Sequence, residues 1–157
     1  RGVSDEAYRT EGWEFVIAGG GLYNNLDYSF AVGFEDGTFA YPNTQPGGGS
    51  PALRRQLRIL RDFITSVDFI RMTPDNSIIT GGTPPGGAAR ALVERGRTIA
   101  IYLRRQVAAS AKEAALPVSR EPGPSAPLQV ELPDGHWRAE WIDTLTGAVV
   151  RTLDVGG

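Results

Sequence analysis

Several residue types are missing or scarce in this 157-residue chain, and each shortage excludes a class of chemistry. Cysteine is absent, which excludes disulfides, thiolate metal sites and thiol nucleophiles. Histidine occurs once, as His136, so a histidine cluster cannot bind a metal and a Ser-His-Asp triad would have to use this residue. It stands beside a turn with no nucleophile motif nearby, which favours an ordinary exposed side chain. Lysine also occurs once, and the net charge of -2 argues against a nucleic-acid partner, which requires clustered basic residues.

Long apolar runs are absent as well. No segment approaches the roughly 18 apolar residues that a membrane-spanning helix needs, so we expect no membrane partner. A hydrophobic content of 41% with 22% charged residues is typical of globular proteins. The glycine-rich segments match neither the P-loop nor the dinucleotide-binding pattern, so the sequence gives no support for a phosphate-binding cofactor. We expect neither a cofactor nor a metal.

Two helices are expected in the first half of the chain. The first covers residues 5–18, with acids in its first turn and glycines at 19–21 to end it, and we expect Trp13 and Phe15 in the core. The second begins at Ser50 and Pro51, a capping residue followed by proline at the first helical position. Its apolar side chains recur at helical spacing: Leu53, Leu57, Leu60, Ile64 and Val67. The arginines on its other faces are expected to be solvated.

Extended segments and turns fill the rest of the sequence. Residues 22–32 are expected to form a strand and 33–49 a long loop, which is usually functional. Residues 81–87 are rich in glycine and proline and predict a boundary between two units, 1–80 and 88–157. Short strands are expected in the second unit, at residues 89–94, 98–103, 128–132, 136–143 and 148–155. A short helix is expected around residues 108–115. These strands, with tight turns, predict a small antiparallel β-sandwich.

The segment after the first glycines is the candidate binding site. It carries five residues suited to a sugar: Tyr23, Asn24, Asn25, Asp27 and Tyr28. Aromatic rings stack on the apolar face of a pyranose, and amides and a carboxylate bind its hydroxyls. The same residues would also suit the packing of a buried strand. Glu35 and Asp36 are the other nearby acids, but their sequence is that of an ordinary turn, so we assign no catalytic residue.

Two stretches resemble one enzyme family. The run Tyr-Arg-Thr-Glu-Gly-Trp-Glu-Phe-Val-Ile-Ala-Gly-Gly-Gly-Leu-Tyr-Asn-Asn-Leu-Asp-Tyr-Ser-Phe at 8–30 resembles the last part of the catalytic barrel in a group of TIM-barrel glycoside hydrolases. The runs Gly-Arg-Thr-Ile-Ala-Ile-Tyr-Leu at 96–103 and Trp-Arg-Ala-Glu-Trp-Ile-Asp-Thr-Leu-Thr-Gly at 137–147 look like the small β domain, labelled as collagen-binding, that follows the barrel. Thr144 stands where those domains commonly have proline.

The resemblance implies an α/β plus all-β fold: a C-terminal remnant of a (β/α)8 barrel, with residues 22–30 as its eighth strand, followed by the β-sandwich domain. In retaining barrels of this type the two catalytic glutamates end the fourth and seventh strands. Both strands would precede Arg1, and because the chain opens inside a helix without methionine we expect such residues to exist. The family also suggests a secreted or periplasmic location.

The expected function is therefore part of a glycoside hydrolase that lacks the catalytic glutamates and supplies one wall of a sugar site. Its partners would be a carbohydrate substrate and the rest of the barrel, either an upstream segment or a separate chain. This chain alone would be inactive. The alternative is a non-catalytic carbohydrate- or protein-binding β module, in which Trp137, Trp141 and Tyr102 form a surface platform. Trp137 and Trp141 share one face of a strand, and burial of that face would be more favourable than exposure. This pattern speaks against the platform.

Overall fold

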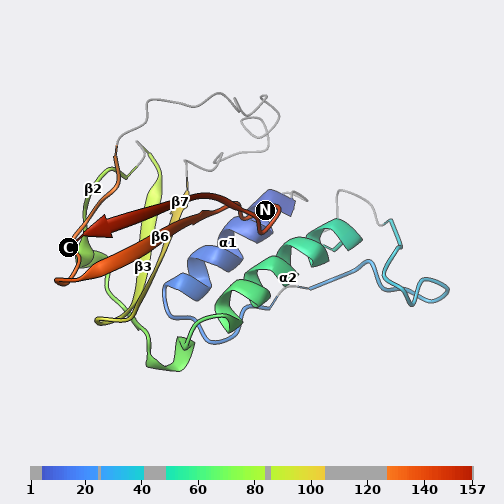
Figure 1. Cartoon of the computed structure of the whole chain (residues 1–157). Coiled ribbons are helices and arrows are strands. Elements are labelled where there is room, and N and C mark those ends of the chain that lie inside the picture. The colour runs from blue at the N-terminus through green and yellow to red at the C-terminus, as the bar shows by residue number, and fades with distance from the viewer. Residues whose placement is uncertain (1–4, 25, 41–48, 84–85, 105–126, 157) are drawn as a thin grey trace.

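The structure is a computed structural model, and it describes residues 5–24, 26–40, 49–83, 86–104 and 127–156 (Figure 1). The helices are α1 (Asp5–Ile17) and α2 (Pro51–Thr65), with short 3-10 turns η1 (Phe69–Arg71) and η2 (Asn76–Ile78). The strands are β1 (Thr73–Pro74), β2 (Ile79–Gly81), β3 (Ala88–Glu94), β4 (Thr98–Arg104), β5 (Gln129–Val130), β6 (His136–Ile142) and β7 (Val149–Gly156).

Both helices form where the sequence predicts them, and their ends are defined by local hydrogen bonds. Ser50 caps α2, since its hydroxyl accepts a hydrogen bond from the Leu53 amide at 2.9 Å. At the end of α1 the amides of Gly19 and Gly20 donate to the carbonyls of Val16 and Phe15, both at 2.9 Å. Gly19 takes a φ of +91°, as a Schellman cap requires.

The two helices lie side by side and run in the same direction (Figure 1). Near their starts Arg9 donates a hydrogen bond to Gln56 at 2.9 Å. Farther along, the rings of Trp13 and Phe63 lie 5.0 Å apart. The contacts of α1 with α2 move toward the C-terminus of both helices together, so the helices are parallel. The connection at 18–49 must therefore lead the chain back before α2 begins.

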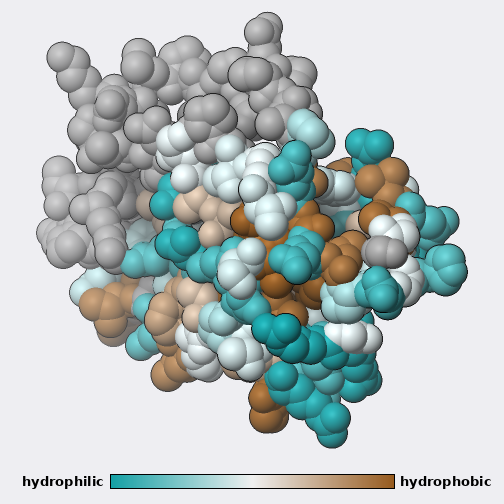
Figure 2. Space-filling view, turned by 90° about the vertical axis from the view of Figure 1, so that its left-hand side faces the viewer, coloured by the Kyte–Doolittle hydropathy of each residue, from teal (hydrophilic) through white to brown (hydrophobic). Residues whose placement is uncertain are grey.

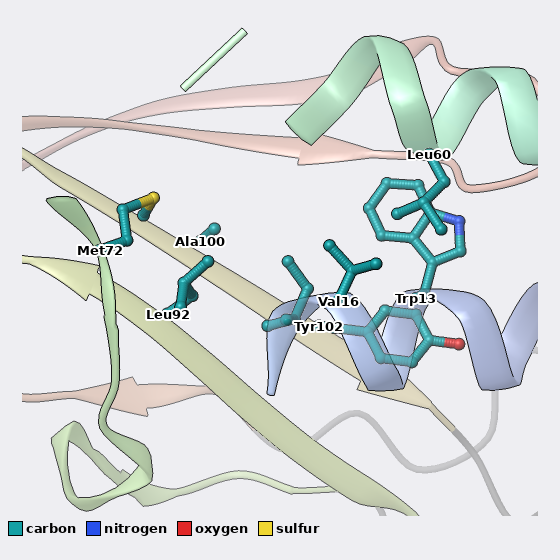
Figure 3. Close-up of a cluster of buried hydrophobic side chains, with 8 residues drawn as sticks. Trp13, Val16, Leu60, Met72, Leu92, Ala100 and Tyr102 are labelled. Carbon is teal, nitrogen blue, oxygen red and sulfur yellow. The ribbon is translucent and has the colours of Figure 1, made fainter. Parts of the chain in front are cut away.

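β3 and β4 form a hairpin that packs under α1. The two strands pair antiparallel from Ala88↔Arg104 to Glu94↔Thr98, and β1 adds to the free edge of β3. The core combines residues of α1, α2, β3 and β4 with Met72, which lies between η1 and β1: Trp13, Val16, Ile17, Leu60, Met72, Leu92, Ala100 and Tyr102 (Figure 3). The turn at Gly96, with a φ of +73°, confirms the predicted hairpin.

The remaining strands form two further antiparallel pairs, β2 with β5 and β6 with β7. β6 and β7 pair along their length, with an irregularity after Trp141. None of the residues in these two strands is buried. On the face that Figure 2 turns toward the viewer, hydrophobic residues reach the surface between hydrophilic ones.

The predicted fold, a barrel remnant followed by a β-sandwich, is wrong. Barrel strands are parallel, whereas every sheet among the described residues is antiparallel. The expected eighth strand at 22–30 does not form: residues 22–24 and 26–30 are turns and irregular backbone, and the isolated bridge of Ala31 with Phe34 follows them. None of the strands that the structure describes pairs with this segment. A sandwich requires two sheets with buried facing sides. Here α1 covers β3 and β4, and no residue of β6 or β7 is fully buried.

The other predictions on the chain have mixed outcomes. Trp13 is buried as expected, but Phe15 is 42% exposed. The predicted helix at 108–115 and much of the loop at 33–49 lie outside the described residues. The division at 81–87 stays a prediction, and the core includes residues from both sides of it. In the described part of the chain, no helix has the length and apolar character needed to cross a membrane.

Candidate functional site

Arg54, in the first turn of α2, holds the loop of residues 26–40 in place. One guanidinium nitrogen, Nη1, donates to Asp27 Oδ2 at 2.9 Å and to Ser29 Oγ at 2.7 Å. The other, Nη2, donates to the backbone carbonyl of Gly37 at 2.8 Å. The guanidinium also lies 4.8 Å from the centre of the Phe30 ring, a cation–π contact. We call this set of contacts the Arg54 clamp.

Both carboxylate oxygens of Asp27 accept hydrogen bonds in or beside the Arg54 clamp. Oδ1 accepts from the backbone amide of Ser29 at 3.0 Å and from the Ser29 hydroxyl, and Oδ2 accepts from Arg54. Burial opposes ionisation of this carboxyl, but the hydrogen bonds from Ser29 and Arg54 outweigh it and hold the pKa of Asp27 below its ordinary value. A low-pKa carboxylate occupied in this way anchors the loop and is poorly suited to proton transfer.

Two glycines make room for the clamp. Gly37 is buried with a φ of +75°, and a Cβ built there would lie 2.7 Å from the Arg54 nitrogens. Gly49 packs against the carboxylate of Asp27, so a Cβ at that position would collide with Oδ1. The close approach of backbone to the ion pair therefore requires glycine at both positions.

The other two acids of the loop complete local turns. Glu35 Oε1 accepts from the Gly33 amide at 2.9 Å, and this hydrogen bond lowers the pKa of Glu35. Asp36 Oδ1 accepts from the amide and the hydroxyl of Thr38, at 3.1 and 2.8 Å. Side chains that bond two residues along the backbone in this way are typical of turns. These contacts hold the turns of the loop.

The predicted sugar-binding residues are divided between packing and exposure. The Tyr23 ring packs against Gly12 of α1, and its hydroxyl donates to the Tyr8 carbonyl at 3.1 Å. Asn24 and Tyr28 are exposed, Asn25 lies outside the described residues, and Asp27 is part of the Arg54 clamp. A sugar role for the five residues stays a prediction. Among those that the structure describes, Asn24 and Tyr28 are the exposed ones.

Exposed apolar side chains are concentrated on the clamped loop and just before it. Three are aromatic: Tyr28 is 45% exposed, Phe30 51% and Phe34 43%. Phe34 also packs on Phe39, with ring centres 5.2 Å apart. Leu26 and Val32 are aliphatic members of the same loop, at 64% and 98%. We call these five residues the loop face, and its backbone is held by the Arg54 clamp.

A hollow of about 370 Å³ lies on the β6–β7 hairpin. It is lined by His136, Trp137, Arg138 and Asp154 among others. Trp137 donates its indole N–H to the Pro133 carbonyl at 3.0 Å. Trp141 is 41% exposed, contrary to the expectation of burial. The platform considered from the sequence loses one member, because Tyr102 is buried and stacks on Trp13 in the core.

Sequence reasoning missed Arg54, which it placed on a solvated helix face. One signal was available: a positive charge in the first turn of a helix is disfavoured by the helix dipole. An arginine there is therefore better explained by an acidic partner. Within the described residues, no group of three or more histidine, aspartate or glutamate side chains is placed to hold a metal.

Comparisons of this chain with protein-family models, with curated proteins and with solved structures each found no match.

Proposed function

We propose that this chain is the carbohydrate-binding part of a glycoside hydrolase, with the aromatic rings of the loop face, Tyr28, Phe30 and Phe34, forming one wall of the sugar site. The catalytic carboxylates would come from another segment, because Asp27, Glu35 and Asp36 are all engaged in holding the loop. The observation that carries the proposal is the pair of features described above: exposed aromatic rings on a loop that the Arg54 clamp holds.

The physical basis is preorganisation. A ring presented to solvent on a fixed backbone loses little conformational entropy when a sugar stacks on it. Tyr28 offers both an aromatic face and a hydroxyl, and Asn24 is an exposed amide near it in sequence. Asp27 contributes indirectly, by fixing the backbone between these side chains and Phe30.

Binding is tested by titrating the protein with a panel of oligosaccharides and following backbone amide resonances. The matched variants are Tyr28→Ala and Trp141→Ala, which remove exposed aromatic rings of the loop face and of β6. Loss of a stacked ring should weaken binding about three- to tenfold for Tyr28→Ala, with no change for Trp141→Ala. The proposal fails if no sugar shifts resonances of the loop, or if both variants weaken binding equally.

The hydrolase part is tested on the native full-length protein with a glycan panel. We expect turnover that is abolished by replacing carboxylates outside residues 24–40. The hydrolase proposal is refuted if turnover survives every such replacement, or if the protein hydrolyses no glycan of the panel.

A protein-binding role is the second candidate, and a specific observation favours it. Leu26 and Val32 of the loop face, together with Leu22, expose aliphatic side chains that a sugar does not need. Val32→Ser distinguishes the two roles. Under the carbohydrate proposal this variant binds oligosaccharides as the parent does, whereas a protein-binding loop would bind no sugar and would lose self-association or partner association in sedimentation experiments.

A further inference from the structure

The strand β6 has a single neighbouring strand among the described residues. β7 lies beside it, and the two form a sheet of their own (Figure 1). At the turn of this hairpin the Asp143 amide donates to the Ala148 carbonyl at 2.9 Å. Asp143 and every second residue before it therefore direct their backbone groups at β7. The irregularity after Trp141 adds its extra residue to β7, so the alternation along β6 is unbroken.

The intervening residues of β6 direct their backbone groups to the opposite edge, which is a template for pairing with a further strand. They are His136, Arg138, Glu140 and Ile142. Two of them carry opposite charges: Arg138 and Glu140 form an ion pair along the strand, with side chains 69% and 33% exposed. The edge therefore presents one base and one acid, two positions apart.

This spacing makes β6 complementary to itself. When two copies of a strand pair antiparallel about a twofold axis, every contact of one residue with another recurs in reverse. An axis at Ala139 places Arg138 opposite the partner's Glu140, and Glu140 opposite the partner's Arg138. The four charges then alternate in sign around a ring. The ion pair within each chain is kept, and each charge gains a second partner.

The alternative registers lack this match. An axis at Arg138 places this side chain opposite its own copy, and an axis at Glu140 does the same for the carboxylate. Like charges directly opposite each other are destabilising. The outward residues in the regular part of β7 are Thr152 and Asp154, the cross-strand partners of Glu140 and Arg138, and they include no base. The charge pattern therefore selects β6 and the register centred on Ala139.

The other face of β6 gains apolar contact in the same register. Trp141 is 41% exposed and would lie opposite the partner's Trp137, and the same pair recurs by symmetry. These positions are not hydrogen-bonded across the two copies, so their side chains approach most closely. Aromatic cross-strand pairs stabilise a sheet. Since no residue of β6 or β7 is buried within one chain, a second copy supplies partners that the hairpin lacks.

We propose that β6 pairs with β6 of a second copy of this chain, so that two hairpins form one four-stranded antiparallel sheet with its twofold axis at Ala139. Charge complementarity identifies the occupant. Because this closed pairing uses the free β6 edge of both copies, association stops at the dimer. The proposal is independent of carbohydrate binding, since it uses neither the loop face nor the Arg54 clamp.

The test measures association of the whole chain by sedimentation velocity over a range of concentrations, and the parent should form dimers as concentration rises. Arg138→Glu and Glu140→Arg each place like charges opposite one another twice and should weaken dimerisation about tenfold or more. An equimolar mixture of the two variants has opposite charges in both pairs and should regain dimers. Val32→Ser, on the loop face, is the control and should dimerise as the parent does. Circular dichroism checks that each variant keeps its secondary structure.

A single-cysteine variant tests the position of the axis. The chain has no cysteine of its own, so Ala139→Cys places two thiols directly opposite each other, at a spacing that a disulfide can bridge. Mild oxidation should link this variant into a covalent dimer. Leu153→Cys, at the cross-strand neighbour of Ala139 on β7, is the matched control and should stay unlinked.

Each of several results would overturn the proposal. In sedimentation these are a parent that stays monomeric, oligomers larger than the dimer, single charge variants that dimerise as the parent does, a mixture that does not regain dimers, or loss of dimers in Val32→Ser. In the oxidation experiment they are no linkage of Ala139→Cys, or equal linkage of Leu153→Cys.

Discussion

The hairpins β3–β4 and β6–β7 are nearly identical as hydrogen-bonded ladders and opposite in burial. Each has seven cross-strand pairs and a glycine of positive φ in its turn. In β3, Leu92 is 0% exposed and Val93 6%, whereas no residue of β6 or β7 is buried. The comparison shows that strand pairing satisfies the backbone hydrogen bonds but does not create a core. A core requires a second layer packed on the sheet.

The helix α1 supplies that layer for β3–β4. Trp13 stacks on Tyr102 of β4, with ring centres 5.9 Å apart. Glu14 bridges both strands, with its carboxylate 2.9 Å from Arg90 and 2.7 Å from Arg104. The β6–β7 hairpin approaches α2 at its turn, where a Cβ on Gly147 would lie 3.3 Å from Ile59.

The largest expected effect comes from truncating one aliphatic side chain in each hairpin. Leu92→Ala leaves a cavity under α1 and should lower the free energy of unfolding by about 2–5 kcal/mol. Val150→Ala, at a side chain 66% exposed in β7, should change it by about 0.5 kcal/mol or less. Urea unfolding measures both. Similar losses in the two variants would mean that β6–β7 is also covered.

The ion pairs of the two hairpins provide the second contrast. Glu14→Gln breaks two partly buried bridges between α1 and the strands and should cost about 1–3 kcal/mol of stability. Its control, Glu140→Gln, removes an exposed pair with Arg138 on β6 and should cost about 1 kcal/mol or less. If added salt reduces the two effects equally, Glu14 is as solvated as Glu140 and the contrast does not hold.

The turn glycines allow a finer comparison, because their backbones match. Gly96 and Gly147 have φ values of +73° and +74°, so alanine at either position should cost about 1 kcal/mol through backbone strain. At Gly96 a Cβ meets open space, whereas at Gly147 it presses on Ile59. Gly147→Ala should therefore lose slightly more stability in thermal unfolding. A larger loss of stability in Gly96→Ala than in Gly147→Ala would contradict the contact of Gly147 with Ile59.

The smallest effect is a pH dependence at the edge of β3–β4. The Ser77 hydroxyl and, more weakly, the Ser77 amide and Arg95 hold the pKa of Asp75 below its ordinary value of 3.8. A depressed folded-state pKa stabilises the fold above the unfolded value and loses this contribution as pH falls through the folded value. Titration of the Asp75 carboxyl by NMR should show the lowered pKa, and Ser77→Ala should raise it. An unchanged titration in Ser77→Ala would contradict this cause.

Elements with signals inside their own segment were predicted well. The cap at Ser50, Pro51 and the leucine spacing place α2, and Arg95-Gly96-Arg97 places the first hairpin. The strand expected at 22–32 failed although Leu26, Tyr28, Phe30 and Val32 alternate as strand residues do. A strand needs a paired neighbour, and here Asp27 and Ser29 bond to Arg54 and to the turn instead.

The same limit applies to the candidate site. The aromatic and polar residues of the loop could be listed from the sequence, but their roles could not. Tyr23 packs on α1, Asp27 anchors the loop, and Tyr28 stays exposed. The residue that organises them, Arg54, lies 27 positions beyond Asp27 in the chain. Its charge in the first turn of α2 indicates an acidic partner, but no local pattern identifies Asp27 as that partner.

By itself, therefore, the sequence determined the positions and ends of both helices and of the two hairpins, because caps, turns and periodicity act over a few residues. Tertiary structure decided which hairpin is covered and which acid meets which arginine. Those outcomes depend on the contact of Glu14 with Arg104 and of Asp27 with Arg54. Such pairs form only when the whole chain selects the packing that buries most apolar surface at least cost to its polar groups.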